Sequence, residues 1–259
     1  AGTTLSSEVI LAENGTLSGN GILTHSLSGP GTISPGQGIG TLTIHDATPG
    51  RLHLEIDGTQ SDQLVSTGEL NLSNTTLTWS AQNLTEAIYP VITYTTLVNG
   101  FQDTNVPPDG YLFDYQYQGN KIALIRSDQA YQIWSEQTHG LSGTNAHFAA
   151  DPDLDGIPNG LEFFTGSDPQ EFTTPHPIKV SRTLDSTHLS FPVATLGKAS
   201  PFYLQSSTDL INWGDPFPGA PFSIIGEEAH FYRPGVGKFS QSATLWTDGV
   251  RYFRLIHQP

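Results

Sequence analysis

The densest group of carboxylates in the sequence lies between residues 151 and 162. The stretch AADPDLDGIPNGLEFFTGSDP places Asp151, Asp153 and Asp155 at alternate positions and contains no lysine or arginine. Carboxylate, amide and carbonyl oxygens are the ligands that hard cations such as Ca²⁺ prefer. Because like charges this close repel one another without a cation between them, the spacing predicts a calcium site. The alternative interpretation is a solvated acidic turn.

The spacing within this stretch is that of a twelve-position calcium loop of the EF-hand type, with a glycine, Gly156, at its sixth position. The expected ligands are the carboxylates of Asp151, Asp153, Asp155 and Glu162, the backbone carbonyl of Ile157, and Asn159 directly or through a water. The loop resembles the calcium repeats of thrombospondin type 3 and dockerin-like modules, although Leu154 stands where a glycine is common. That resemblance implies a structural calcium that stiffens the chain.

A catalytic interpretation rests on Glu55 and Asp57, which lie two residues apart on an expected strand and therefore on one face. Paired carboxylates serve as acid and base in glycoside hydrolysis, and Asp62 is a possible third member. The alternative is a solvated outer face. The nine histidines show no HxH or HExxH spacing, and the sequence has no GxSxG or P-loop motif, so we expect a protein that is not an enzyme.

Residues 1–127 carry short alternating runs, such as GTLTI, RLHLEI and ELNLSNTTLTW, separated by Gly, Asn, Pro and Ser. This pattern predicts short strands joined by turns, and its repetition favours a short right-handed parallel β-helix, or solenoid, over an ordinary β-sandwich. The runs NGTLSGNGIL, GTISPGQGIGTLTI and LEIDGTQSDQLVSTGELNL resemble the autotransporter-associated β-strand repeat of bacterial passenger proteins. The resemblance covers about residues 10–125 and implies a solenoid fold and export.

Two further segments follow. Residues 128–175 are expected to form a helix-loop-helix calcium-binding linker, with Tyr131 and Trp134 on one helical face and a second short helix that ends at Gly166. Residues 176–259 alternate again, in runs such as PFYLQSSTDLINW and VRYFRLIHQ, which predicts a small immunoglobulin-like or fibronectin-like sandwich. These runs resemble the terminal sandwich of large exported proteins of Verrucomicrobia and Planctomycetes.

The composition limits the partners. A formal net charge of −15 over 259 residues argues against nucleic acid and anionic lipid. The sequence has no long apolar run that could enter a membrane. The absence of cysteine and methionine excludes disulfides and favours an oxidising, extracellular location. A chain that begins at Ala1 is expected to come from a longer precursor.

We therefore expect a secreted, non-enzymatic structural protein of the bacterial surface, stabilised by calcium, whose subunits assemble into a fibre or filament. Strand addition between copies is expected at the N-terminal alternating strand, through Leu5, Ser7, Val9 and Leu11. The alternative is an adhesin or carbohydrate-binding module that attaches to polysaccharide. Its candidate sugar platform is Trp213, Phe217, Phe222 and Tyr232. A third and less favoured hypothesis is a β-helix polysaccharide hydrolase.

Overall fold

The computed structural model describes residues 3–5, 8–102, 104–172, 179–182, 186–194, 196, 202–207, 209–212, 223–226, 235–242 and 252–257. These residues form a mainly β structure, as the sequence predicts. The chain divides into two compact units, of which the first holds the residues up to Ala130 and the second begins at Tyr131. Among the described residues, no helix has the length and hydrophobicity needed to cross a membrane.

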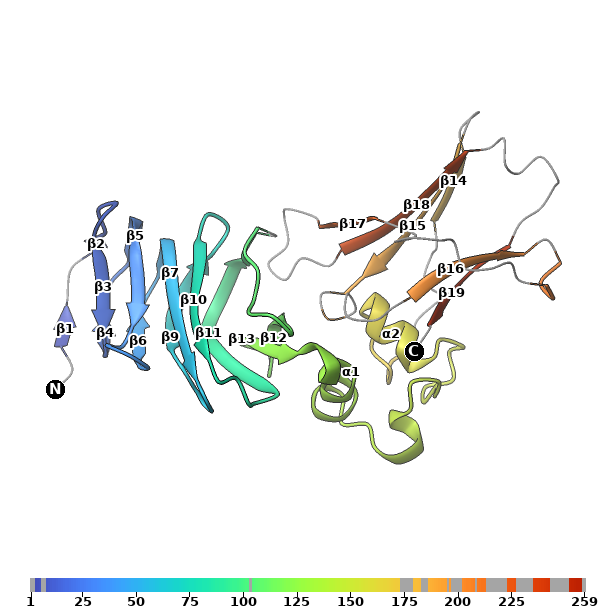
Figure 1. Ribbon diagram of the computed structural model, residues 1–259, viewed down its shortest axis with the longest axis horizontal. Helices are drawn as coiled ribbons and strands as arrows, with labels where there is room; N and C mark the ends of the chain where they lie inside the picture. The colour runs from blue at the N-terminus through green and yellow to red at the C-terminus, as the bar shows by residue number, and fades with distance from the viewer. Residues whose placement is uncertain are drawn as a thin grey trace. The chain divides into compact units, whose positions relative to one another are not determined.

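The first unit contains a large mixed sheet of 13 strands within the described residues, which succeed one another along the chain in Figure 1. One row of parallel strands comprises β1 (Thr3–Leu5), β4 (Gly21–Leu23), β6 (Thr41–Ile44), β9 (Gln63–Asn71) and β11 (Ile88–Asn99). A second row comprises β2 (Val9–Ile10), β3 (Thr16–Gly19), β5 (Leu27–Pro35), β7 (Ala47–Asp57) and β10 (Thr76–Gln82). The short β8 (Gln60–Ser61) pairs with β7, and β12 (Tyr111–Tyr117) and β13 (Lys121–Arg126) form an antiparallel hairpin next to β11.

Neighbouring strands of the first row are separated in the sequence by strands of the second row. Gly21 pairs with Leu42, Leu42 with Leu64 and Leu64 with Ile92, which are offsets of 21, 22 and 28 residues. All three of these ladders are parallel. Parallel neighbours need a long connection between them, and here the intervening residues supply the strands of the second row.

The core of the first unit follows from the alternation of apolar and polar residues. In β7, Leu52, Leu54 and Ile56 are buried, whereas Glu55 is half-buried and Asp57 is exposed. Successive side chains of a strand point to opposite faces, so the leucines and isoleucines of both rows join one apolar cluster. Members of that cluster from other strands include Leu23, Ile33, Leu42, Ile44, Leu64 and Leu70.

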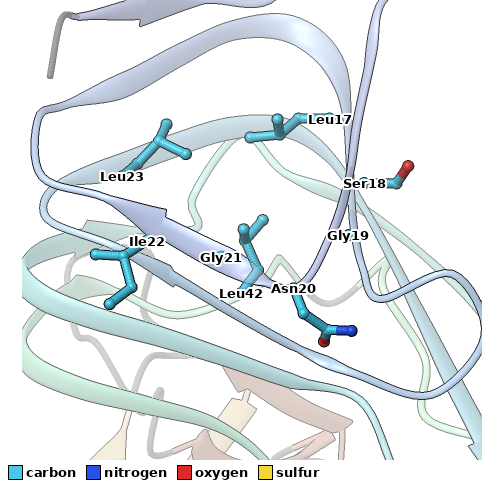
Figure 2. Close-up of a pocket in the computed structure, with 8 residues that line it drawn as sticks. All are labelled: Leu17, Ser18, Gly19, Asn20, Gly21, Ile22, Leu23 and Leu42. Carbon is cyan, nitrogen blue, oxygen red and sulfur yellow. The ribbon is translucent and has the colours of Figure 1, made fainter. Parts of the chain in front are cut away.

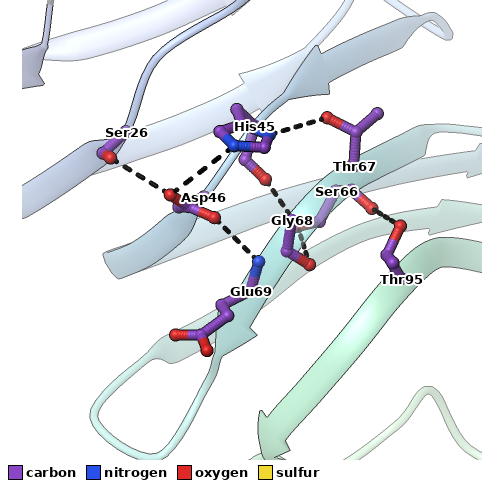
Figure 3. Close-up of polar contacts among 8 residues, drawn as sticks. All are labelled: Ser26, His45, Asp46, Ser66, Thr67, Gly68, Glu69 and Thr95. Atoms are coloured by element: carbon purple, nitrogen blue, oxygen red, sulfur yellow. Dashed lines mark hydrogen bonds and ion pairs between the residues drawn. The ribbon is translucent and has the colours of Figure 1, made fainter.

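Polar side chains next to the strand ends accept backbone N–H groups of residues about 20 positions further along the chain. Asn20 Oδ1 accepts the backbone N–H of Thr41 at 2.6 Å, and Asp46 Oδ1 accepts that of Glu69 at 2.8 Å. Figure 3 shows Asp46 between Ser26, a residue of the preceding turn, and Glu69 of the following turn. Each such acceptor replaces the ladder partner that the backbone loses where the chain bends.

The helices and the remaining strands follow β13, and all of them from Tyr131 onward belong to the second unit. A 3₁₀ turn at Ser127–Gln129, α1 (Ala130–Gln132) and a π-helical turn at Ile133–Thr138 follow β13, and after a second 3₁₀ turn at Gly143–Ala146 comes α2 (Asn159–Thr165). The strands are β14 (Lys179–Arg182), β15 (Ser186–Val193), β16 (Phe202–Ser207), β17 (Ser223–Gly226), β18 (Gly235–Ser242) and β19 (Tyr252–His257). They form an antiparallel sheet in the order β14-β15-β18-β17 and an antiparallel pair, β16-β19.

The predicted short helix before Gly166 is confirmed, since α2 ends at Thr165 and Gly166 follows in the left-handed conformation at φ 85°. The helix packs on β15: Phe164 and Val193 are both buried, and the backbone N–H of Ala194 donates to Phe164 O at 2.8 Å. The helix and β15 therefore pack within one unit, although they lie on either side of the domain boundary predicted between residues 175 and 176. That boundary remains a prediction.

Candidate metal centre

The acidic loop before α2 is a tight turn held by its own carboxylates. Asp151 Oδ2 accepts the N–H of Gly156 at 2.9 Å, and Asp155 Oδ1 accepts that of Ile157 at 2.7 Å. Gly156 has a φ of 89°, and Leu154 has a φ of 62°, a conformation that a residue with a Cβ rarely adopts. The sharp turn expected at Gly156 is thus present, and Leu154 in the same loop also has a left-handed backbone conformation.

The turn brings three carboxylates of the predicted site together. One oxygen atom from each of Asp151, Asp153 and Asp155 lies within 4.8 Å of the others. Asp151 Oδ1 and Asp153 Oδ2 are buried and have no hydrogen-bond partner. Buried polar atoms are almost always satisfied in native structures, by protein groups or by water, so these atoms are free to bind a cation or a water molecule.

Glu162 lies on α2, and its side chain is fully buried, with a relative exposure of 0%. Both of its carboxylate oxygens lack a hydrogen-bond partner. Burial, followed by the negative charges of Asp153, Asp155 and Asp151, raises the pKa of the Glu162 carboxyl to about 8. Burying an ionised carboxylate without a nearby cation or hydrogen-bond donor costs free energy. A divalent cation would offset this cost and the repulsion between the carboxylates.

Asn159 begins α2 and is held in a defined orientation. Its Nδ2 donates to Asn145 O at 2.7 Å and to His147 O at 3.0 Å. The side chain is fully buried, and Oδ1 has no hydrogen-bond partner. Because the amide nitrogen faces these carbonyls, the oxygen is the atom that remains for another ligand.

The donor set fits a hard cation. The groups that converge are the carboxylate oxygens of Asp151, Asp153 and Asp155, which suit Ca²⁺ rather than a metal that prefers nitrogen or sulfur. Of the predicted ligands, the structure brings together Asp151, Asp153 and Asp155 and places Glu162 within their electrostatic influence. The carbonyl of Ile157 remains a predicted ligand.

Aromatic packing fixes α2 under the loop. Phe163 lies between Trp134 and Tyr131, with ring centroids 5.4 and 5.5 Å away. Phe148 packs on Tyr131 at 4.9 Å and also lies so close to Gly160 that a Cβ there would come within 2.0 Å of its ring. Tyr131 and Trp134, expected on one helical face, lie with their ring centroids 5.8 Å apart. The roles of Phe148 and Gly160 were not predicted, because neither belongs to the calcium pattern.

The carboxylates of the first unit are arranged differently. Glu55 and Asp57 share the outer face of β7 as expected, beside a hollow of about 230 Å³ that Ser80 and Gln82 also line. Asp62 does not join them, since it is fully buried and accepts the N–H groups of Gly40 at 2.8 Å and Glu55 at 2.9 Å. Asp62 therefore holds the backbone together.

The predicted assembly strand is not continuous. Leu5 ends β1, which pairs with β4, whereas Val9 lies in β2, which pairs with β5. Leu5 thus belongs to the first row and Val9 to the second, and Val9 and Leu11 are half-buried against the core. Ser7 lies outside the described residues, as do Trp213, Phe217, Phe222 and Tyr232 of the predicted sugar platform.

Comparisons with models of protein families, with curated proteins and with solved structures find no match to this chain.

Proposed function

We propose that this chain is a non-enzymatic structural protein of the cell exterior, in which a short right-handed β-solenoid is followed by a calcium-stabilised module and an immunoglobulin-like sandwich. The observation that carries the proposal is the buried Glu162 carboxyl, whose two oxygens have no partner beside three converging aspartates. Calcium in such a loop stabilises the fold and performs no chemistry on a substrate.

The solenoid part of the proposal is supported by the strand registers. Parallel ladders with offsets of 21, 22 and 28 residues connect Gly21, Leu42, Leu64 and Ile92 in turn. Asn20 and Asp46 each accept an N–H from the next turn at a similar offset. A chain that winds repeatedly past the same position produces this pattern, in which each turn contacts its neighbours.

The calcium part of the proposal is supported by the charge balance of the loop. Residues 128–175 contain eight Asp and Glu residues and no Lys or Arg, so this segment supplies no lysine or arginine to neutralise Glu162. Extracellular calcium modules of this kind bind in the range of about 10⁻⁴ to 10⁻³ M. Calcium at the concentrations found outside cells would keep such a site filled.

The test is a calcium titration followed by calorimetry and by thermal unfolding. We expect the wild-type chain to bind Ca²⁺ and to unfold at a higher temperature with it than in the presence of a chelator. Glu162→Gln and Asp153→Asn should weaken or abolish both effects. Glu55→Gln is the matched control, since it removes a carboxylate from the outer face of β7, and it should leave calcium binding unchanged. A wild-type chain that neither binds Ca²⁺ nor gains stability from it would contradict the calcium assignment.

Attachment to polysaccharide is a second candidate function, favoured by the hollow beside β7. Its lining includes the carboxylates of Glu55 and Asp57, the hydroxyl of Ser80 and the amide of Gln82, which can all hydrogen-bond sugar hydroxyls. Binding of the chain to a glycan array, lost in Glu55→Gln and retained in Glu162→Gln, would support this function. Turnover of a glycan that Glu55→Gln abolishes would instead support a hydrolase.

A further inference from the structure

His53 on β7 has both of its ring nitrogens bonded to hydroxyl groups of β10. Its Nδ1 lies 2.9 Å from Thr78 Oγ1, and its Nε2 lies 3.1 Å from Ser80 Oγ. The two strands run parallel, with His53 opposite Thr78 and Glu55 opposite Ser80. Since alternate residues of a strand share a face, these four side chains lie together on the outer face of the second row.

This arrangement places a serine next to a base. Neutral imidazole has one N–H group and one acceptor nitrogen. When the hydrogen is on Nδ1, Thr78 Oγ1 accepts it, and Nε2 is then the acceptor of the Ser80 hydroxyl. A nucleophile within hydrogen-bond reach of a base, with a third group that orients the base, is typical of an activated hydroxyl. Thr78 is therefore a positioning residue for His53, and His53 is the base for Ser80.

Ser80 is also accessible to a small molecule. It lines the hollow of about 230 Å³ beside β7, together with Glu55, Asp57 and Gln82. Gln82 lies two positions after Ser80 on β10, so its side-chain amide can donate to the carbonyl oxygen of a molecule held there. Glu55 adds a negative charge, which favours the imidazolium ion that forms when His53 accepts a proton. The carboxylates also repel an anionic ligand, so the fitting ligand is uncharged.

Another hollow of the first unit lacks this chemistry. It has a similar volume, about 240 Å³, and its described lining residues, drawn in Figure 2, include Ser18 and Asn20 but no histidine and no carboxylate. Its remaining side chains are apolar, among them Leu17 and Leu42. Each hollow thus contains a serine, and of these two serines Ser80 is the one bonded to a histidine.

We propose that Ser80 is an acyl-acceptor site, which takes the acyl group of a small, uncharged carboxylic ester. Ser80 Oγ forms a bond to the carbonyl carbon, the bond between that carbon and the alcohol oxygen of the ester breaks, and His53 Nε2 carries the serine proton to the departing alcohol. The products are an acylated Ser80 and a free alcohol. One acylation per chain is a covalent modification and requires no turnover, so the inference goes beyond the proposed structural role and does not depend on it.

The test is the reaction of the full chain with p-nitrophenyl acetate, followed by release of nitrophenol and by mass spectrometry of the peptides. We expect a single fast acetylation, at Ser80, which is lost in Ser80→Ala. His53→Gln should slow the reaction roughly a hundredfold or more, because it removes the general base. Ser18→Ala is the matched control, since Ser18 lines a hollow of similar volume, and it should be acetylated like the wild type.

Thr78 gives a result that a purely structural role would leave unchanged. Thr78→Val keeps the shape of the side chain but removes the acceptor for Nδ1–H, and should slow acetylation roughly tenfold or more. Thr78→Ser keeps the hydroxyl and should retain the wild-type rate. Acetylation of Ser18 as fast as that of Ser80, an unchanged rate in His53→Gln, or a wild-type chain that is not acetylated would overturn the proposal. Thermal unfolding of the same samples, with and without Ca²⁺, reports on their folding and tests the proposed function separately.

Discussion

Asp46, which lies between β6 and β7, is in direct contact with Gly68 of β9. Asp46 Oδ1 accepts the N–H of Glu69, and a Cβ added to Gly68 would lie 2.1 Å from that same oxygen. Asn20 and Gly40 repeat the arrangement, since Asn20 Oδ1 accepts the N–H of Thr41 and would lie 2.3 Å from a Cβ at Gly40. Glycine is needed at these positions to admit the polar side chain of the preceding turn.

We expect Gly68→Ala to lower the free energy of unfolding of the first unit by about 1–3 kcal/mol, because the methyl group forces Asp46 away from the N–H of Glu69. Denaturant unfolding would measure the change. Gly15→Ala is the matched control, since the nearest atom to its Cβ would be Ala12 O at 3.2 Å, and its effect should be clearly smaller. Equal effects of the two substitutions would show that the Asp46 contact is unimportant.

The contacts of Asn105 beside β10 give a second prediction, since its Oδ1 accepts the N–H of Leu77 at 2.7 Å and its Nδ2 donates to Thr75 O at 2.8 Å. Asn105→Ala removes both the acceptor for Leu77 N–H and the donor to Thr75 O, and should destabilise the first unit by about 1–3 kcal/mol. Asn105→Asp keeps the acceptor and should be less damaging. Hydrogen exchange at Leu77 would separate the two, because its amide should exchange faster in the alanine variant and near the wild-type rate in the aspartate variant. Unchanged exchange in Asn105→Ala would contradict the role of Asn105 as a substitute strand.

The parts of this structure that depend on local pattern were predictable from the sequence. Alternation in RLHLEI places Leu52 and Leu54 inside and Glu55 on the outer face, and the loop spacing brings Asp151, Asp153 and Asp155 together. In both cases the residues involved are close in sequence. The geometry of a strand or a turn then determines how they lie.

The parts that depend on contacts between residues far apart in the sequence were not predictable. Asp62 was considered as a partner of the Glu55 carboxylate, but it bonds the backbone of Gly40, 22 residues away. The segment from Leu5 to Leu11 alternates like one strand, yet it crosses between two rows. Register between parallel strands is set by the length of each turn and by the fit of the core, and neither can be read from a short window.

Asn159 has two separable roles, which a third prediction distinguishes. Asn159→Asp keeps an oxygen for a cation but loses the bonds from Nδ2 to Asn145 O and His147 O, and it adds a negative charge. We expect the calcium-free protein to lose about 2–3 kcal/mol of stability, with part of the loss recovered on adding Ca²⁺. Asn145→Ala is the control, since alanine keeps the backbone carbonyl that accepts from Asn159 Nδ2, and it should be close to neutral in thermal unfolding.

The buried Glu162 gives a prediction for the pH dependence of stability without calcium. Its pKa is raised from 4.5 to about 8 in the folded protein, so the folded state keeps a proton that the unfolded state has released. Stability from this group is therefore fully present below about pH 4.5 and is lost as the pH rises toward 8. Over that range the loss is on the order of several kcal/mol. Thermal unfolding in a chelator should accordingly show a less stable second unit at pH 8 than at pH 5.

Glu162→Gln provides the control, because glutamine cannot titrate. We expect this variant to show a much weaker dependence on pH in the chelator; a remainder should persist, since burial also raises the pKa of Asp153. With saturating Ca²⁺ the wild-type trend should reverse, because the cation binds the ionised carboxylates and competes with protons for them. A calcium-free wild type whose stability rises between pH 5 and pH 8 in step with Glu162→Gln would mean that Glu162 is already compensated within the fold.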